Sequence, residues 1–165
     1  MVSRRLAREE GHRRKFLCVV DDTPECDRAV VYAATRAIHT AGAVVLLYVI
    51  PPGDFQHWRG VEEMMRAEAM DEARQRLAVT AERVHAFAPG VDAELVIREG
   101  QPAEAIHRLI DEDRDVAILV LAAGTGSEGP GPLVSSIAAR AVPPFPIPVT
   151  IVPGDLDDED IAAVA

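Results

Sequence analysis

The sequence predicts an α/β domain built on a parallel β-sheet with helices on both faces. Apolar runs rich in valine, isoleucine and leucine alternate along the chain with stretches of helical periodicity. The apolar runs lack alternation of apolar and polar residues, which is typical of strands buried on both faces. Parallel neighbours of this kind are joined by right-handed crossovers, so a βαβαβαβαβ order follows.

Five short apolar runs are the expected strands, and turn-forming residues end each of the first three. Asp21-Asp22 follow the first run, Pro51 to Gly53 the second, and Gly100 closes the third. The predicted strands are residues 15–20, 43–50, 93–100, 116–123 and 146–153.

Four helices are expected between these strands. For the first, Thr23 is the predicted N-cap, Pro24 the first helical residue and Gly42 the C-cap glycine. The second runs from Val61 to about residue 88, with apolar residues every four positions as far as Leu77. The other two cover about residues 101–112 and 133–142.

Length and charge limit the functions open to the chain. Its 165 residues suit one domain, and a net charge of −10 argues against nucleic acid as a partner. We expect residues 1–14 to form a basic tail, 15–154 the domain and 155–165 an acidic tail, with both tails solvated. Neither an apolar run of roughly 20 residues nor a secretory signal is present, so we expect a cytoplasmic protein without a membrane partner.

A binding site is expected at the carboxyl edge of the sheet, where open α/β sheets bind their ligands. Asp21-Asp22, Val49-Ile50 and the glycine-rich stretch AAGTGSEGPGPLVSSIAAR (residues 122–140) all reach that edge. Glycine backbone and a following helix supply N–H groups for phosphate. Two prolines in the stretch remove such donors, and no basic side chain lies between residues 115 and 139. The stretch is therefore either a phosphate cradle or a plain surface turn.

Common enzyme classes lack their required residues. A phospho-acceptor receiver domain needs an aspartate after its third strand and a lysine after its fifth, but the third run ends in Arg98-Glu99-Gly100 and the only lysine is Lys15. Neither a P-loop nor a GxSxG elbow is present. Trp58, the only tryptophan, is expected to anchor the loop 51–60 or to act as a lid or partner contact.

Several stretches together resemble the universal stress protein (UspA) family. They are FLCVVDDTPECDRAVVYAATRA, AVVLLYVI, REGQPAEAIHRLIDEDRDVAILVLAA and the pair AAGTGSEGPGPLVSSIAAR…PIPVTIVP, spanning about residues 15–154. The resemblance implies a Rossmann-like three-layer α/β/α sandwich, similar to the adenine nucleotide alpha hydrolases. Its five-stranded parallel sheet would have the order 3-2-1-4-5. It also implies a homodimer paired through the fifth strand, Pro148 to Pro153.

One branch of the family binds ATP through the motif G-2x-G-9x-G-[ST], and the other branch does not. In this chain Ala123 stands at the first glycine of the motif and Gly126 at the second. Ser135-Ser136 stand at the final Gly-Ser, with eight residues after Gly126 in place of nine. The resemblance assigns adenosine contacts to Asp21 and Val49. Phosphate contacts fall to the loop and helix residues Ala123, Gly124, Thr125, Gly126, Ser135 and Ser136.

Two functions therefore remain in view. The first is a non-enzymatic, dimeric stress-response protein whose pocket holds ATP as a regulatory ligand, with Mg²⁺ at Asp21 or Asp22. The alternative is an interaction module of the same fold whose pocket binds no nucleotide. A nucleotide hydrolase or transferase is a third class, for which the sequence offers neither base nor nucleophile.

Overall fold

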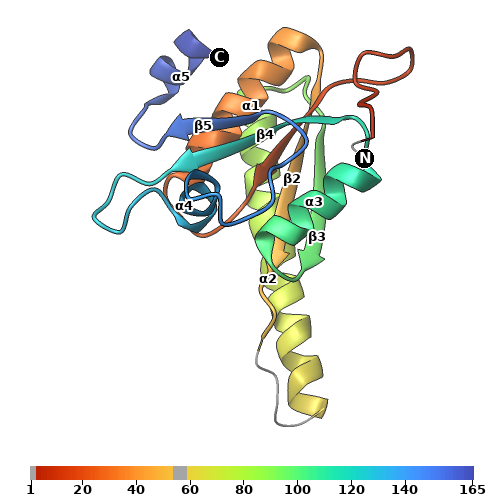
Figure 1. The fold of residues 1–165 in the computed structure, drawn as a ribbon, viewed down its shortest axis with the longest axis vertical. Helices are drawn as coiled ribbons and strands as arrows, with labels where there is room; N and C mark the ends of the chain where they lie inside the picture. The colour runs from red at the N-terminus through yellow and green to blue at the C-terminus, as the bar shows by residue number, and fades with distance from the viewer. Residues whose placement is uncertain (1–2, 54–58) are drawn as a thin grey trace.

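A computed structural model describes residues 3–53 and 59–165 and contains a five-stranded parallel sheet of order β3-β2-β1-β4-β5 (Figure 1). Every pair of neighbouring strands is parallel. The predicted strand order is thus confirmed. The strands are β1 (Lys15–Val19), β2 (Ala43–Ile50), β3 (Ala93–Glu99), β4 (Val116–Ala123) and β5 (Val149–Pro153).

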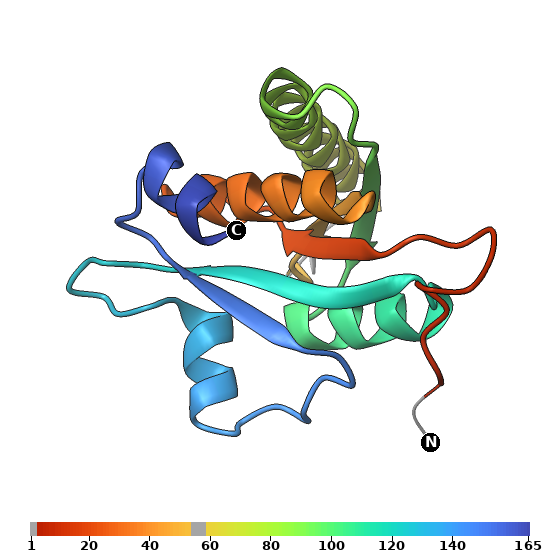
Figure 2. The same cartoon turned by 90° about the horizontal axis from the view of Figure 1, so that it is seen from above.

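Helices cover both faces of the sheet, as Figure 2 shows from above. They are α1 (Cys26–Thr40), α2 (Arg59–Phe87), α3 (Pro102–Glu112), α4 (Pro132–Ala138) and α5 (Asp158–Val164). Helices α1 and α2 lie on one face, with α5 beside α1, and α3 and α4 lie on the other. This three-layer arrangement is the Rossmann-like fold that the sequence predicts.

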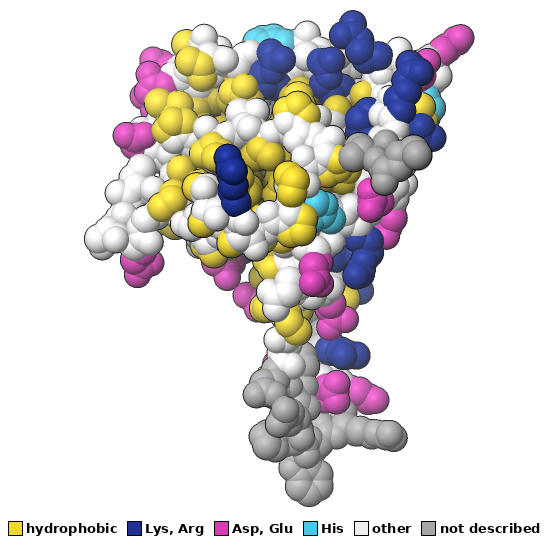
Figure 3. Space-filling view, in the orientation of Figure 1, with side chains coloured by type: hydrophobic (Ala, Val, Ile, Leu, Met, Phe, Trp, Pro, Cys, Tyr) yellow, Lys and Arg dark blue, Asp and Glu magenta, His cyan; other side chains and the backbone are white. Residues whose placement is uncertain are grey.

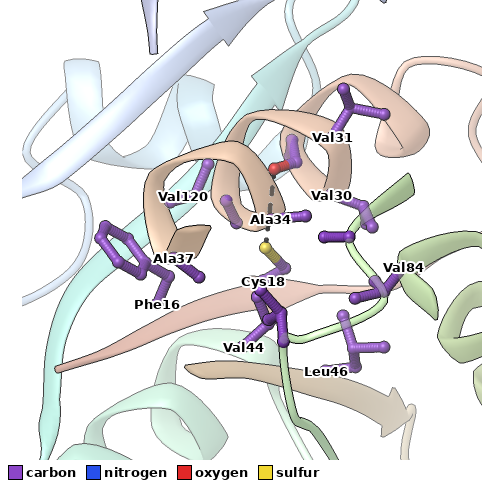
Figure 4. Packing of buried hydrophobic residues seen from close by; sticks show 14 of the residues in the cluster. Phe16, Cys18, Val30, Val31, Ala34, Ala37, Val44, Leu46, Val84 and Val120 are labelled. Carbon is purple, nitrogen blue, oxygen red and sulfur yellow. Dashed lines mark hydrogen bonds between the residues drawn. The ribbon is translucent and has the colours of Figure 1, made fainter. Parts of the chain in front are cut away.

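The central strand β1 contributes side chains to both layers of the core. Phe16 and Cys18 are fully buried toward α1, and Leu17 is fully buried toward α3. Figure 4 shows Cys18 among Val30, Ala34 and neighbouring side chains, with its Sγ 3.7 Å from the carbonyl oxygen of Ala29. Burial raises the pKa of the Cys18 thiol, which therefore acts as a small apolar group.

Helix α1 begins later than predicted, and Thr23 is hydrogen-bonded to Asp21 instead of capping the helix. The backbone N–H of Thr23 donates to Asp21 Oδ1 at 2.9 Å, and the Thr23 hydroxyl donates to the same oxygen. This Asx turn directs the Thr23 hydroxyl toward Asp21, and Thr23 lies outside the helix. The helix starts at Cys26 with Glu25 as its N-cap, so the predicted roles of Thr23 and Pro24 are wrong.

The end of α1 also differs from the prediction. Ala41, not Gly42, takes the left-handed conformation at the C-cap, with φ 51°. Gly42 donates its N–H to Ala37 O at 2.9 Å. A Cβ on Gly42 would lie 2.5 Å from the carbonyl oxygen of Arg14. The glycine therefore permits a close backbone approach at the start of β2.

The long helix α2 is packed along only part of its length. The predicted apolar stripe is buried at Ala73 and Leu77, which are at most 1% exposed. At the other end of the stripe, Val61 is 50% and Met65 45% exposed. Figure 1 shows why: this end of α2 extends beyond the sheet. Helical periodicity predicted the helix correctly but not the length of sheet available to cover it.

The N-terminal residues pack against the domain, contrary to the expected solvated tail. Leu6 donates its backbone N–H to Arg114 O at 2.9 Å. The Arg5 guanidinium donates to Ile110 O at 2.6 Å, close to the end of α3. His12 Nδ1 lies 2.7 Å from a carboxylate oxygen of Asp115. Backbone carbonyls at a helix end attract a cation, which explains why a basic segment is held there.

The acidic C-terminal residues form α5, so they are not a solvated tail either. Asp157 caps the helix by accepting from the Asp160 N–H at 2.8 Å. Ile161 is fully buried in the core cluster under α1. The charge of residues 155–160 led to the prediction of a solvated tail, although the five residues that follow, IAAVA, are apolar.

The loop containing Phe55, His57 and Trp58 lies outside the described residues, and the expectation for Trp58 stays untested. Among the described residues, no helix combines the length and apolar character needed to cross a bilayer.

Candidate functional site

A pocket of about 230 Å³ opens at the carboxyl edge of the sheet, between β1 and β4. The chain leaves β1 toward β2 on one side and reaches β4 on the other, so this is the topological switch point where such sheets bind ligands. The strands contribute Val19 to Asp21, Val49 and Leu121-Ala122. The helices and loops contribute Thr23, Glu25, Cys26, Ala29, Pro102 and Pro130 to Val134.

Asp21 and Val49 line the pocket, as the sequence predicted. The Asx turn to Thr23 holds the exposed Asp21 carboxylate at the mouth of the pocket. Val49 is half-buried near the end of β2 and offers an apolar wall. A carboxylate beside an apolar wall can accept hydrogen bonds from a ligand whose flat part is apolar.

Asp22 is directed elsewhere, despite its place next to Asp21. Its carboxylate forms an ion pair of 2.6 Å with Arg76 on α2, and the residue does not line the pocket. Within residues 3–53 and 59–165, no cluster of three or more His, Cys, Asp or Glu is arranged to hold a metal ion. A Mg²⁺ ion held by protein groups alone has little support at this pair.

The first glycine of the loop, Gly124, is tightly packed. A Cβ at this position would lie 2.9 Å from Gly129 O and 3.1 Å from Glu25 Oε1. Its N–H donates to Pro130 O at 3.0 Å. Gly124 therefore lets the loop after β4 pack against the start of α1, and its own donor is already used.

The middle of the loop projects away from the pocket. Thr125 and Gly126 are exposed, and the loop closes on itself through a Gly129 N–H to Gly126 O hydrogen bond of 3.2 Å. Figures 1 and 2 both show this segment, between β4 and α4, reaching out from the body of the domain. Neither Thr125, Gly126 nor Ala123 lines the pocket.

The two predicted serines lie inside α4 instead of at its beginning. The helix starts at Pro132, and the Ser135 N–H is already bonded to Gly131 O at 2.9 Å. Ser135 is exposed, and neither serine lines the pocket. The helix start that borders the pocket is Gly131 to Val134, one turn earlier than the family motif indicates.

The charge of the pocket is acidic. Within the described part of the chain, Asp21 and Glu25 are the charged residues that line it, and neither lysine nor arginine does. The pocket also contains the Cys26 thiol, whose pKa is raised to about 11, chiefly by burial. The thiol is therefore protonated near neutral pH and is a poor nucleophile.

Sequence reasoning missed Glu25, Cys26, Pro102 and Gly131 as pocket residues. Signals for two of them were present in the chain. Gly131-Pro132 is a glycine N-cap followed by proline at the first helical position, which marks a helix start. Pro102 likewise opens α3 directly after β3. Glu25 and Cys26 carried no comparable pattern.

A Rossmann-like sandwich with a pocket at its switch point defines a fold that commonly binds nucleotides. The sequence profile described as the Universal stress protein family matches residues 12–153. The chain belongs to the universal stress protein family. No curated protein matches the chain.

Solved structures support the fold. The universal stress protein UspA from Lactobacillus plantarum superposes with a TM-score of 0.67 at 18% identity, covering 84% of this chain and 97% of that one. A universal stress protein from Archaeoglobus fulgidus in complex with dAMP gives 0.59 at 19%, covering 84% and 97%. A family member from Arabidopsis thaliana with AMP bound gives 0.59 at 20%, covering 89% and 99%.

Proposed function

We propose that this chain is a regulatory adenine-nucleotide-binding protein without catalytic activity. The observation that carries the proposal is the pocket at the switch point, where Asp21 and Val49 stand together as the family pattern implies. The related structures with dAMP and AMP show that this fold accommodates an adenine nucleotide. The adenosine part of the ligand would occupy the pocket, with Asp21 accepting its hydrogen bonds and Val49 against the base.

The pocket favours a ligand with few phosphates. Its volume of about 230 Å³ is below the roughly 300–1,000 Å³ of common small-molecule sites, so it suits a nucleoside-sized group. Asp21 and Glu25 repel added negative charge, and no lining cation offsets it. The Gly124 donor is occupied, and Pro132 has none. We therefore favour AMP over the ATP–Mg²⁺ ligand that the family motif suggested.

The same lining supports a regulatory over a catalytic role. Among the described residues that line the pocket there is no histidine, and their one thiol, that of Cys26, is protonated. General base and nucleophile chemistry would need such groups in reach of the ligand. A bound nucleotide would act by shifting the conformations of α1, α4 and the loop between β4 and α4, as any ligand that binds one state preferentially does.

Calorimetric titration of the full chain with AMP, ADP and ATP, with and without Mg²⁺, tests the proposal. The variant Asp21→Ala should lose binding. Asp111→Ala removes the same charge from the exposed surface of α3 and is the matched control. Micromolar AMP binding that is lost only in Asp21→Ala supports the proposal. Equal binding by both variants, or no binding by the wild type up to millimolar AMP, overturns the proposal and favours the interaction module.

We also propose that the chain forms a homodimer through β5. This strand is an edge of the sheet, and Ile151 on it is 43% exposed. A hollow of about 710 Å³ beside it is lined by Ile137, Phe145 and Val149. An exposed apolar edge strand offers unpaired backbone groups to which another chain can add a strand. Ile151→Lys should give a monomer in light scattering, whereas Leu95→Lys on the opposite edge strand β3 should not. A monomer for Leu95→Lys and a dimer for Ile151→Lys would indicate that the interface is at β3.

A further inference from the structure

Another hollow lies at the amino end of the strands, opposite the pocket at their carboxyl edge. It has a volume of about 520 Å³, and its charged lining consists of one carboxylate, Glu9, and five arginines, Arg4, Arg5, Arg8, Arg14 and Arg36. We call it the arginine pocket. Figure 3 shows Lys and Arg side chains gathered along the top of the molecule, toward the N-terminal segment. In a chain with a net charge of −10, this is a local reversal of sign.

The N-terminal segment builds one wall of the arginine pocket. Arg5 anchors that wall, because its guanidinium is used in hydrogen bonds to the carbonyls of Ile110 at 2.6 Å and Asp113 at 3.2 Å. Arg114 adds a hydrogen bond of 2.9 Å to Arg4 O. The opposite wall comes from Arg14, just before β1, and from Arg36 on α1. The cations thus come from three separate parts of the chain.

Most of these cations lack a carboxylate partner. Only Arg4 has one among the described residues, Glu9 at 3.0 Å. Arg36 donates to the backbone oxygen of Ala165 at 3.3 Å. Several arginines elsewhere have carboxylate partners, as Arg76 has Asp22 and Arg98 has Glu112. Five arginines with a single carboxylate among them leave an excess of positive charge, and an anion in the pocket would relieve the resulting repulsion.

The lining indicates the class of anion. Guanidinium groups bind phosphate in a bidentate, planar geometry that lysine cannot match, and the pocket contains no lysine. Its volume falls within the roughly 300–1,000 Å³ range of small-molecule sites. Ala117, Ile118 and Pro148 give it an apolar floor. The acidic remainder of the chain disfavours a long polyanion such as a nucleic acid.

We propose that the arginine pocket binds a small anion carrying two or more phosphate groups, at a site separate from the adenine-nucleotide pocket. Arg8, Arg14 and Arg36 hold the phosphates, and Arg5 positions the N-terminal wall. The proposal does not depend on nucleotide binding at Asp21, because the two pockets share no residue.

Titration calorimetry with inorganic tripolyphosphate, at fixed ionic strength and without Mg²⁺, tests the proposal. The double variant Arg14→Gln/Arg36→Gln should weaken binding by at least about tenfold, because two charge-assisted contacts are lost. The control Arg74→Gln/Arg108→Gln removes the same charge from exposed helix positions and should change binding by less than about twofold. Arg8→Gln, which changes an exposed side chain, should weaken binding by itself.

Further measurements separate the alternatives. Asp21→Ala should bind tripolyphosphate as the wild type does, which distinguishes this site from the nucleotide pocket. Vesicles with anionic phospholipid headgroups present the same phosphate chemistry on a surface. Binding to vesicles but not to tripolyphosphate overturns the small-ligand proposal. An equal loss of tripolyphosphate affinity in the two double variants would mean that only the total charge of the protein matters. That result also overturns the proposal.

Discussion

Arg83 on α2 and Asp158 at the start of α5 form an ion pair of 3.1 Å between segments 75 residues apart. The same guanidinium donates to Asp27 at 3.1 Å, and Arg28 pairs with Asp158 at 2.9 Å. This cluster fastens the C-terminal helix to α1 and α2. The chief buried anchor of that helix is Ile161, which is fully buried.

Ile161→Ala should destabilise the whole domain, because Ile161 belongs to the main core cluster. Removing a fully buried isoleucine costs about 2–5 kcal/mol in unfolding free energy. Urea unfolding measures this loss. Val164→Ala on the same helix is the control, since Val164 is 66% exposed and should change stability by under about 0.5 kcal/mol. Similar midpoints for both variants would mean that α5 is not part of the cooperative core.

The Arg83 cluster should lose its contribution to stability in acid. Hydrogen bonds from Arg83 lower the pKa of Asp158 below its ordinary 3.8. Burial alone would raise the pKa of Asp27, but hydrogen bonds from Arg83 and Arg28 outweigh it and lower that pKa too. A carboxyl group whose folded pKa is lowered stabilises the fold above its unfolded pKa, and this is lost as pH falls through the folded value.

The pH dependence can be measured as a difference between variants. Arg83→Gln should destabilise the protein by about 1 kcal/mol at neutral pH, since the partners are partly exposed and screened. The gap to the wild type should narrow as the pH falls below about 3.8. Arg74→Gln, which removes an exposed pair with Asp71, should show no such gap. A constant gap from neutral pH to acid would exclude the ion pairs as its cause.

Two glycines of the loop after β4, Gly124 and Gly126, should respond differently to substitution by alanine. Gly124→Ala places a Cβ against Gly129 O and Glu25, which should cost about 1–3 kcal/mol. Gly126 has open space around it and no positive φ. Gly126→Ala should be neutral, or stabilise by up to about 1 kcal/mol through the unfolded state. Thermal unfolding of the two variants side by side tests the assignment, and equal shifts would contradict it.

The acidic pocket predicts an order of nucleotide affinities. AMP should bind at least as tightly as ATP without Mg²⁺, because each added phosphate meets Asp21 and Glu25 and no lining cation. Glu25→Gln should bring ATP closer to AMP. Competition titrations with each nucleotide provide the measurement. ATP binding more tightly than AMP by about tenfold or more would require phosphate donors other than the lining residues.

The sequence predicted the sheet well because burial on both faces leaves a direct compositional mark on each strand. It placed Asp21 and Val49 at the carboxyl edge for a related reason, since strand ends locate that edge. Their role as adenosine contacts is implied by the family resemblance and stays a prediction. It failed where a few specific contacts decide the outcome. The Asx turn of Asp21 delays α1, and the earlier start of α4 carries Ser135 and Ser136 into the helix interior. Such choices depend on single hydrogen bonds, which periodicity does not encode.

The packing of the chain ends was unpredictable for a different reason. Ile161 begins a short apolar stretch, IAAVA (161–165), directly after the acidic residues 155–160, and Arg5 donates to Ile110 O across 105 residues of sequence. In the first half of α2 the pattern misled in the opposite direction. Its apolar stripe is regular and predicts burial, but Val61 and Met65 are exposed because no sheet lies beneath them. The local sequence pattern shows which face of a segment is apolar enough to be buried. It does not show whether another part of the fold lies against that face.

The contrast between the two thiols gives the pocket a built-in chemical reporter. Cys18 is sealed in the core, whereas Cys26 is partly accessible and lines the pocket. Alkylation at alkaline pH should therefore label Cys26 alone in the folded protein, at a rate set by how freely reagent enters. Any occupant of the pocket should slow that rate, so occupancy can be followed by mass spectrometry on the unmodified chain without a dye, a tag or an introduced cysteine.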